Sequence, residues 1–241
     1  MVRGGRPLPC LGPEPPERLL PAGLLERDPE AAARGRPALF LAVTPDKTRP
    51  QLENTLVHEL HHWGLASCCP EPAVRQRLDA ASRPVQFAYE ALTAFGEGLA
   101  MLAAAGGPNV HPHAVSNRED RERWDRELQS VDRDIKRLES FFLRILDGEC
   151  ATEQELFQAA MEFFDVQGPW YTVGWTMAQA VETVRGRNVL IDCMYDLRRL
   201  LVAYNEVVAE RARGAETTAV WSDALIDRLV LTASGSQSET S

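Results

Sequence analysis

Residues 58–62 read His-Glu-Leu-His-His, an H-E-x-x-H sequence with the residue types of a zinc hydrolase. In a helix, positions i and i+4 lie one turn apart on the same face, so the imidazoles of His58 and His62 can reach one zinc ion. Glu59 lies beside them, where its carboxylate can take a proton from a water molecule activated by the zinc. The motif therefore predicts a zinc-dependent hydrolase with Glu59 as its general base. His61 points about 100° away from His62, so we expect it at the surface or in support of the site.

The surroundings of the motif favour a functional interpretation over a chance one. The chain has five histidines, and three of them fall within these five residues. Four large apolar side chains recur on the opposite side of the helix: Leu52, Leu56, Leu60 and Trp63. This phase predicts that one face of the helix packs while the other holds the metal. The competing interpretation is an ordinary buried helix whose histidines hold no ligand.

A third zinc ligand is required, because a catalytic site usually has three protein ligands and a water molecule. Glu97 is the best candidate, since it lies between Gly96 and Gly98 in a second predicted helix. Glycine inside a helix costs roughly 0.5–1 kcal/mol relative to alanine, so two of them around a carboxylate indicate a close approach to the first helix. Glu90, two turns earlier on the same face, is the competing ligand or a neighbour of the site. The alternative is a surface glutamate at a helix break.

Three other side chains stay open as the third ligand. In metzincins the motif continues with glycine at position 65 and histidine at position 68, where this chain has Leu65 and Cys68. Cys68 could still supply a thiolate, although such a shell favours a closed structural site. His111 or His113 could reach the metal from a loop, or contact the substrate or its oxyanion instead. A plain surface loop is the simplest interpretation of these two histidines.

The composition predicts a soluble, acidic protein. Its formal net charge is -9 and its isoelectric point is near 5.1, which argues against nucleic acid or an anionic membrane as the partner. The longest apolar run, residues 37–43, is too short to span a bilayer, and the N-terminal residues do not resemble a signal peptide, so we expect a cytoplasmic protein. Its five cysteines lack the spacing of a disulfide framework, and free thiols are expected. Nucleophilic catalysis by Cys68 or Cys69 is a weaker alternative to zinc chemistry.

The chain divides into one domain with two appendages. Residues 1–36 are rich in Pro, Gly and Arg and predict a flexible arm, residues 37–233 form a single domain, and residues 234–241 are a disordered polar tail. Residues 37–43 are the one convincing strand, short and apolar. Helices are expected from a capping box at Thr48 and Gln51 to Trp63, and near residues 84–106, 116–147, 153–165, 171–185, 189–212 and 221–232. The expected fold class is mainly α within α+β, with a small, short-stranded sheet near the N-terminus.

The pairing of residues 55–64 with residues 97–100 resembles the gluzincins, the zincin branch whose third ligand is a glutamate on a helix. More narrowly, it is similar to an uncharacterised family of zinc-dependent peptidases that carries a domain-of-unknown-function label. The similarity continues through residues 169–177 and 186–191, and so covers residues 37 to about 210.

The resemblance implies a zincin-like helical domain and a peptide or protein substrate. It also implies that His58, His62 and Glu97 hold Zn²⁺ and that Glu59 is the base. Tyr171 becomes a candidate for stabilising the tetrahedral oxyanion, although a tyrosine near the start of a helix more often serves packing.

A non-enzymatic function is the main rival to a peptidase. A zinc-stabilised helical interaction module would account for the long charged helix expected near residues 116–147. The coordination shell distinguishes the two, because a fourth position left for water favours the enzyme, whereas a closed shell that includes Cys68 favours the module.

Overall fold

The computed structural model describes residues 41, 43–68, 70–211 and 218–229, and these residues form helices and contain no strand. The expected α+β class with a small sheet is therefore wrong for the described part of the chain. The predicted strand, residues 37–43, lies mostly outside the described residues, and Leu41 and Val43 are not in a strand. A strand requires a hydrogen-bonding neighbour, and these residues provide none. The predicted arm (1–36) and tail (234–241) also lie outside the described residues.

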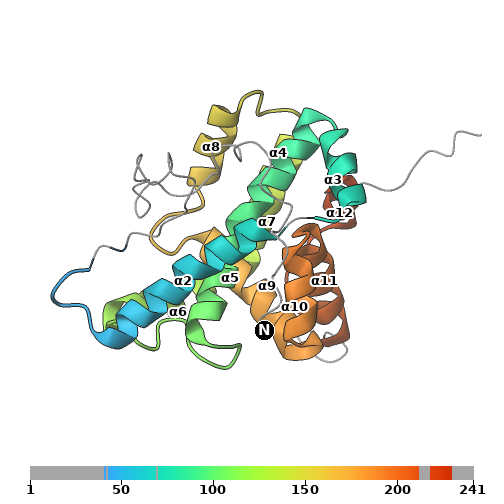
Figure 1. The fold of residues 1–241 in the computed structure, drawn as a ribbon. Coiled ribbons are helices and arrows are strands. Elements are labelled where there is room, and N and C mark those ends of the chain that lie inside the picture. Colours follow the sequence, from blue (N-terminus) through green and yellow to red (C-terminus); the bar gives the residue numbers. More distant parts are fainter. Residues whose placement is uncertain (1–40, 42, 69, 212–217, 230–241) are drawn as a thin grey trace, which may run out of the picture.

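Most of the described helices follow one another with short connections, and a longer loop joins α5 to α6 (Figure 1). Their bounds are α2 Arg49–Ser67, α3 Pro72–Asp79, α4 Arg83–Leu92, the 3-10 turn η1 Thr93–Phe95, α5 Gly96–Ala105, α6 Arg118–Leu128, α7 Val131–Leu146, α8 Glu153–Met161, α9 Pro169–Arg185, α10 Arg187–Met194, α11 Arg198–Arg211 and α12 Asp223–Leu229. Among the described residues, no helix is long and apolar enough to cross a membrane.

Local sequence signals set the starts of two helices. The capping box of Thr48 and Gln51 is present at α2, and a second one, of Thr152 and Glu155, is present at α8. Both pair side chains with backbone N–H groups that the first helical turn leaves unsatisfied. The predicted end of α2 at Gly64 is wrong, because the helix continues through this glycine to Ser67.

Three of the expected helices are divided. The segment expected at 84–106 consists of α4, the tighter turn η1 and α5, and the charged segment expected at 116–147 consists of α6 and α7. The segment expected at 189–212 likewise consists of α10 and α11. The apolar period continues through the first two interruptions, so it gives no sign of these breaks. Gly106 ends α5 in the left-handed conformation, with φ of 88°, which glycine adopts without strain.

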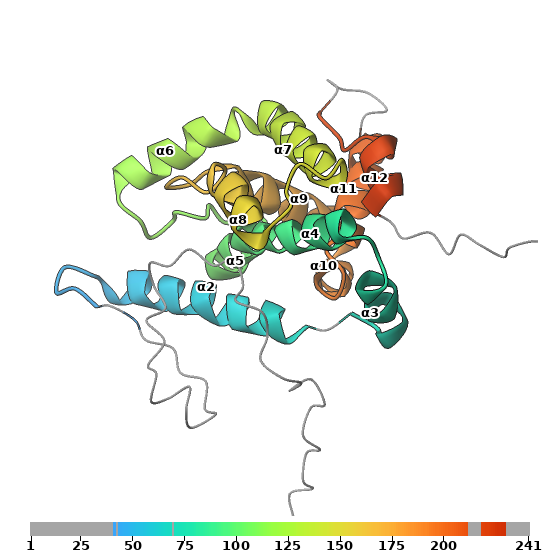
Figure 2. The ribbon, with the colours of Figure 1, turned by 90° about the horizontal axis from the view of Figure 1, so that it is seen from above.

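Helix α9 occupies the middle of the fold. It packs against α5 on one side and against α6, α7, α10 and α11 on others, and α5 in turn separates it from α2 (Figure 2). Aromatic rings fill the core around it, and Phe95 contacts Trp170 and Trp221 with ring centroids 5.0 and 5.9 Å apart. Helix α5 therefore contacts both α2 and α9, although the three helices are distant in sequence.

The outer face of α2 differs from the prediction. Leu56 and Leu60 were expected to pack, but they are 39% and 50% exposed in the described structure. Helix α2 instead packs against α5 through the face that carries its two motif histidines. The helical period separates the leucines from the histidines, but the prediction that the leucine face packs is wrong, because the period does not show which face meets a neighbouring helix.

Candidate metal centre

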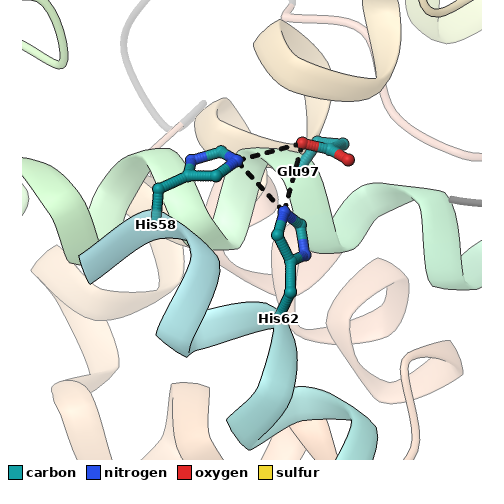
Figure 3. A group of neighbouring side chains, drawn as sticks. All are labelled: His58, His62 and Glu97. Carbon is teal, nitrogen blue, oxygen red and sulfur yellow. Dashed lines mark hydrogen bonds and ion pairs between the residues drawn. The ribbon is translucent and has the colours of Figure 1, made fainter. Parts of the chain in front are cut away.

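The motif helix and α5 cross with their polar side chains facing each other. His58 and His62 project from successive turns of α2, and Glu97 projects from the first turn of α5 (Figure 3). Glu97 Oε2 lies 3.2 Å from His58 Nε2 and 3.3 Å from His62 Nε2, and the two Nε2 atoms are 3.0 Å apart. Three possible ligand atoms therefore converge on one point. Within the described part of the chain, these three residues form the group of His, Cys and carboxylate side chains that could hold a metal ion.

Gly96 and Gly98 let α5 lie close to two different helices. A Cβ atom on Gly96 would lie 2.7 Å from Leu65 Cδ2 of α2, so this glycine permits the close crossing of α2 and α5. A Cβ atom on Gly98 would lie 2.1 Å from the backbone nitrogen of Trp175 in α9. The prediction that both glycines serve the contact with α2 is therefore wrong for Gly98, which permits α5 to touch α9 at Gly174.

The donor atoms fit a zinc ion. In a tetrahedral shell with bonds of 2.0–2.1 Å, neighbouring donors lie about 3.3 Å apart. The three separations in this structure, 3.0, 3.2 and 3.3 Å, come close to that value. The atoms are electron-rich and face one another, so a cation or a proton must lie among them to offset their repulsion. Imidazole and carboxylate groups are also ligand types that zinc prefers.

The close approach of the three side chains shifts the pKa values of Glu97 and His62. Burial raises the pKa of Glu97, but hydrogen bonds and positive charge from His58 and His62 outweigh burial and lower it to about 2. Burial lowers the pKa of His62, but the hydrogen bond and charge of Glu97, with the charge of Glu59, raise it overall. These opposite shifts favour a proton on His62 beside an ionised Glu97 carboxylate.

Glu59 and Tyr171 lie at the edge of this group. Glu59 is 8% exposed, and its charge raises the pKa of both His62 and Tyr171. The Tyr171 hydroxyl comes from the first turn of α9 and hydrogen-bonds with Glu97. Burial is the main cause that raises the pKa of Tyr171, followed by the charge of Glu97 and this hydrogen bond. The phenol therefore stays protonated and keeps its O–H available as a donor.

Comparison with known proteins supports the chemistry that this geometry allows. The family model described as "Putative zinc dependent peptidase (DUF5700)" matches residues 24–213, which is more than half of the chain. The chain belongs to this family. The match begins upstream of residue 37, where the sequence predicted the domain to start. No curated protein and no solved structure matches the chain. Family membership makes zinc the cofactor, and the group of two histidines and one glutamate could hold it.

The other candidate ligands lie elsewhere in this zinc peptidase family member. Cys68 caps the end of α2 and does not join the three-residue group of the described structure, and Cys69 lies outside the described residues. Glu90 is on α4, where burial and the charge of Glu153 raise its pKa. His111 pairs with Asp125 of α6 at 3.1 Å.

His113 and His61 are also separate from the group. His113 Nε2 lies 3.0 Å from Nε2 of Gln167, just before α9. His61 is partly buried, and burial, followed by the charges of His62 and His58, lowers its pKa to about 4. It remains neutral beside the metal group at neutral pH.

Two residues that position the site were not identified from the sequence. Asn54 donates from its side chain to the carbonyl oxygen of Ala104 at 2.9 Å, which ties α2 to the far end of α5. Gly174 receives α5 at Gly98, and a Cβ atom on it would lie 2.8 Å from the carbonyl oxygen of Phe95. The sequence did offer a signal for Gly174, because a glycine inside a helix destabilises the helix there as much as at Gly96 and so indicates a close contact.

Proposed function

We propose that this protein is a zinc metallopeptidase of the gluzincin type, in which His58, His62 and Glu97 hold the ion and Glu59 is the general base. The convergence of three donor atoms at 3.0–3.3 Å, with a second carboxylate beside them, carries the proposal. Three protein ligands leave a fourth position for water, as catalytic zinc sites do. A closed structural shell would need a fourth ligand, and Cys68 lies outside the group in the described structure. The geometry therefore favours the enzyme over the interaction module.

The residues of the site divide the reaction between them. Zinc bound here would supply a Lewis acid that acidifies a water molecule and polarises the scissile carbonyl. Glu59 accepts the proton of the attacking water and then donates it to the nitrogen of the leaving amine. Tyr171 donates its hydroxyl hydrogen to the carbonyl oxygen as negative charge develops there, which its raised pKa permits. Until the substrate arrives, the Glu97 carboxylate accepts the hydrogen bond of the Tyr171 hydroxyl.

The substitution Glu59→Gln tests the general base. Glutamine has nearly the same shape but cannot accept the proton, so the variant should keep about one zinc per chain and lose 10²- to about 10⁴-fold in peptide cleavage. The assay follows cleavage of a mixed peptide library by mass spectrometry, with metal analysis of the same samples.

A matched control is available on the same helix. Glu53 pairs with Arg49 and its side chain is 59% exposed, so Glu53→Gln should keep both zinc and activity. A Glu59→Gln protein that cleaves as fast as the wild type would overturn the assigned base. A zinc-loaded wild-type protein that cleaves none of the peptides would instead favour the zinc-stabilised module.

A further inference from the structure

The start of α9 is fastened to a loop that lies outside the three-residue metal group. This loop, residues 107–117, connects α5 to α6 and carries His113. The amide nitrogen of Gln167 donates to His113 Nε2 at 3.0 Å, across 54 residues of sequence. Gln167 is 8% exposed and precedes Pro169, the first residue of α9, by two positions. The bond is therefore a shielded tertiary contact next to the helical turn that carries Tyr171.

The imidazole of His113 is held in one orientation. Because the amide nitrogen of Gln167 can only donate, His113 Nε2 is the acceptor, and Nδ1 of the neutral ring carries the hydrogen and faces Ser116 Oγ at 2.9 Å. The backbone N–H of His113 donates to His111 Nδ1 at 3.0 Å. Burial, the largest influence, lowers the pKa of His113 to about 4. The ring therefore stays neutral and keeps this pattern of hydrogen bonds at neutral pH.

A second contact fixes the same side of α9. Trp124 of α6 lies against the His113 ring, with centroids 5.3 Å apart, and against the Trp175 ring, with centroids 5.8 Å apart. Trp175 follows Tyr171 by four residues, so the two side chains lie on one face of α9. The loop and α6 thus hold α9 on both sides of Tyr171 along that face.

The backbone before α9 has little freedom to adjust. Gly168 is its N-cap, and a Cβ atom there would lie 2.5 Å from the carbonyl oxygens of Phe163 and Phe164. The turn that follows α8 therefore lies tightly against the N-cap of α9, while His113 holds Gln167. Loss of either contact would let this turn rotate or shift.

We propose that His113 is a positioning residue for Tyr171: its hydrogen bond to Gln167 sets the rotation of the first turn of α9 and so holds the phenol against Glu97. This inference rests on the proposed function, in which the Tyr171 hydroxyl meets the substrate carbonyl. A misplacement of about 1 Å at a reacting centre can lower the rate about 100-fold. Because the zinc ligands lie on α2 and α5, the shift should leave metal binding intact.

The experiment compares His113→Leu with His113→Gln and with a matched control. His113→Leu removes the acceptor, whereas the side-chain oxygen of His113→Gln restores one for Gln167. Gln179→Leu is the control, because Gln179 also ties α9 to this loop, donating to Pro108 O at 3.2 Å, but lies two turns beyond Tyr171. We expect His113→Leu to lower kcat about 10- to 100-fold with KM and zinc content unchanged, His113→Gln to recover most of it, and Gln179→Leu to keep kcat.

A double variant separates positioning from a general loss of structure. If His113 acts through Tyr171, His113→Leu combined with Tyr171→Phe should be no slower than Tyr171→Phe alone. Losses that multiply in the double variant would overturn the proposal.

A spectroscopic arm does not depend on activity. In protein labelled with ¹³C at the tyrosine Cζ, the Tyr171 signal is identified by its absence in Tyr171→Phe. It should shift in His113→Leu, return in His113→Gln and stay in place in Gln179→Leu. An unmoved signal in His113→Leu would refute the positioning role even if no peptide were cleaved. A shifted signal without peptide cleavage would support the positioning role and count against the proposed function alone.

Discussion

The substitution Gly98→Ala should push α5 and α9 apart and so displace Glu97 and Tyr171, which these two helices carry. The added Cβ atom would lie 2.1 Å from the backbone nitrogen of Trp175 and 2.3 Å from the carbonyl carbon of Gly174, whereas ordinary contacts begin at 3.4 Å. Both obstacles are backbone atoms of a central helix, so no side-chain rotation can relieve them. The two helices must move apart by more than 1 Å along this line, which is the difference between 3.4 and 2.1 Å.

The expected loss of stability follows from two opposing contributions. Overpacking in a core costs about 1–3 kcal/mol, and the upper end applies because backbone meets backbone. Alanine gains at most about 1 kcal/mol over glycine in a helix. The free energy of unfolding should therefore fall by about 2 kcal/mol, which corresponds to a decrease in Tm of about 4–8 °C for a chain of this length. Peptide cleavage should fall as well, because Tyr171 moves with α9 away from Glu97.

Thermal unfolding followed by circular dichroism measures this effect, with Gly64→Ala as the control. A Cβ atom on Gly64 meets nothing within 4 Å, and this residue is an exposed position inside α2. The control should gain about 0.5–1 kcal/mol through helix propensity alone, and its Tm should rise. A Gly98→Ala protein that melts at or above the wild-type temperature would refute the reasoning from the helix crossing.

Two further predictions concern the metal. Glu97→Ala should weaken zinc binding at least about tenfold while Cys68→Ala leaves it nearly intact, and calorimetric titration showing the reverse order would contradict the assigned ligands. The proton on His62 stabilises the zinc-free fold fully below its unfolded pKa, and this contribution is lost as the pH rises through its raised folded pKa. Because zinc must displace this proton, the increase in Tm on zinc addition should grow as the pH rises above about 6.5, the ordinary pKa of histidine, and through the raised pKa of His62. The Tm is compared with and without zinc at each pH, so that the titration of His61 and His113 affects both measurements equally. An increase in Tm on zinc addition that does not change with pH would contradict the prediction.

Interactions between residues a few positions apart were predictable from the sequence. The H-E-x-x-H motif lies on a helix, and the capping box of Thr48 and Gln51 begins α2 where the sequence predicted it. The helix expected from residue 153 begins there, after the capping box of Thr152 and Glu155. Such features depend on helical geometry, which repeats every 3.6 residues whatever the rest of the chain does. Family membership agrees with the zinc peptidase resemblance that the motif indicated.

Predictions that depended on the neighbours of an element were less successful. Leu56 and Leu60 were expected to pack, but they are exposed in the described structure because α5 packs on the histidine side of α2. Gly64 continues its helix, whereas Gly106 ends one. A glycine permits either outcome, and the packing around it decides which one occurs.

The sequence by itself determined the pair of motif histidines and the adjacent carboxylate, because one turn of helix places them together. The sequence narrowed the candidates for the third zinc ligand to a few residues, but their spacing could not distinguish among them. Only the tertiary structure brought Glu97, 39 residues from His58, to 3.2 Å from it. The close contact of α5 with α9 at Gly98 and the hydrogen bond between Gln167 and His113 are also set by the tertiary structure. No local period relates residues on different helices, so their contacts depend on how complementary surfaces pack across the whole fold.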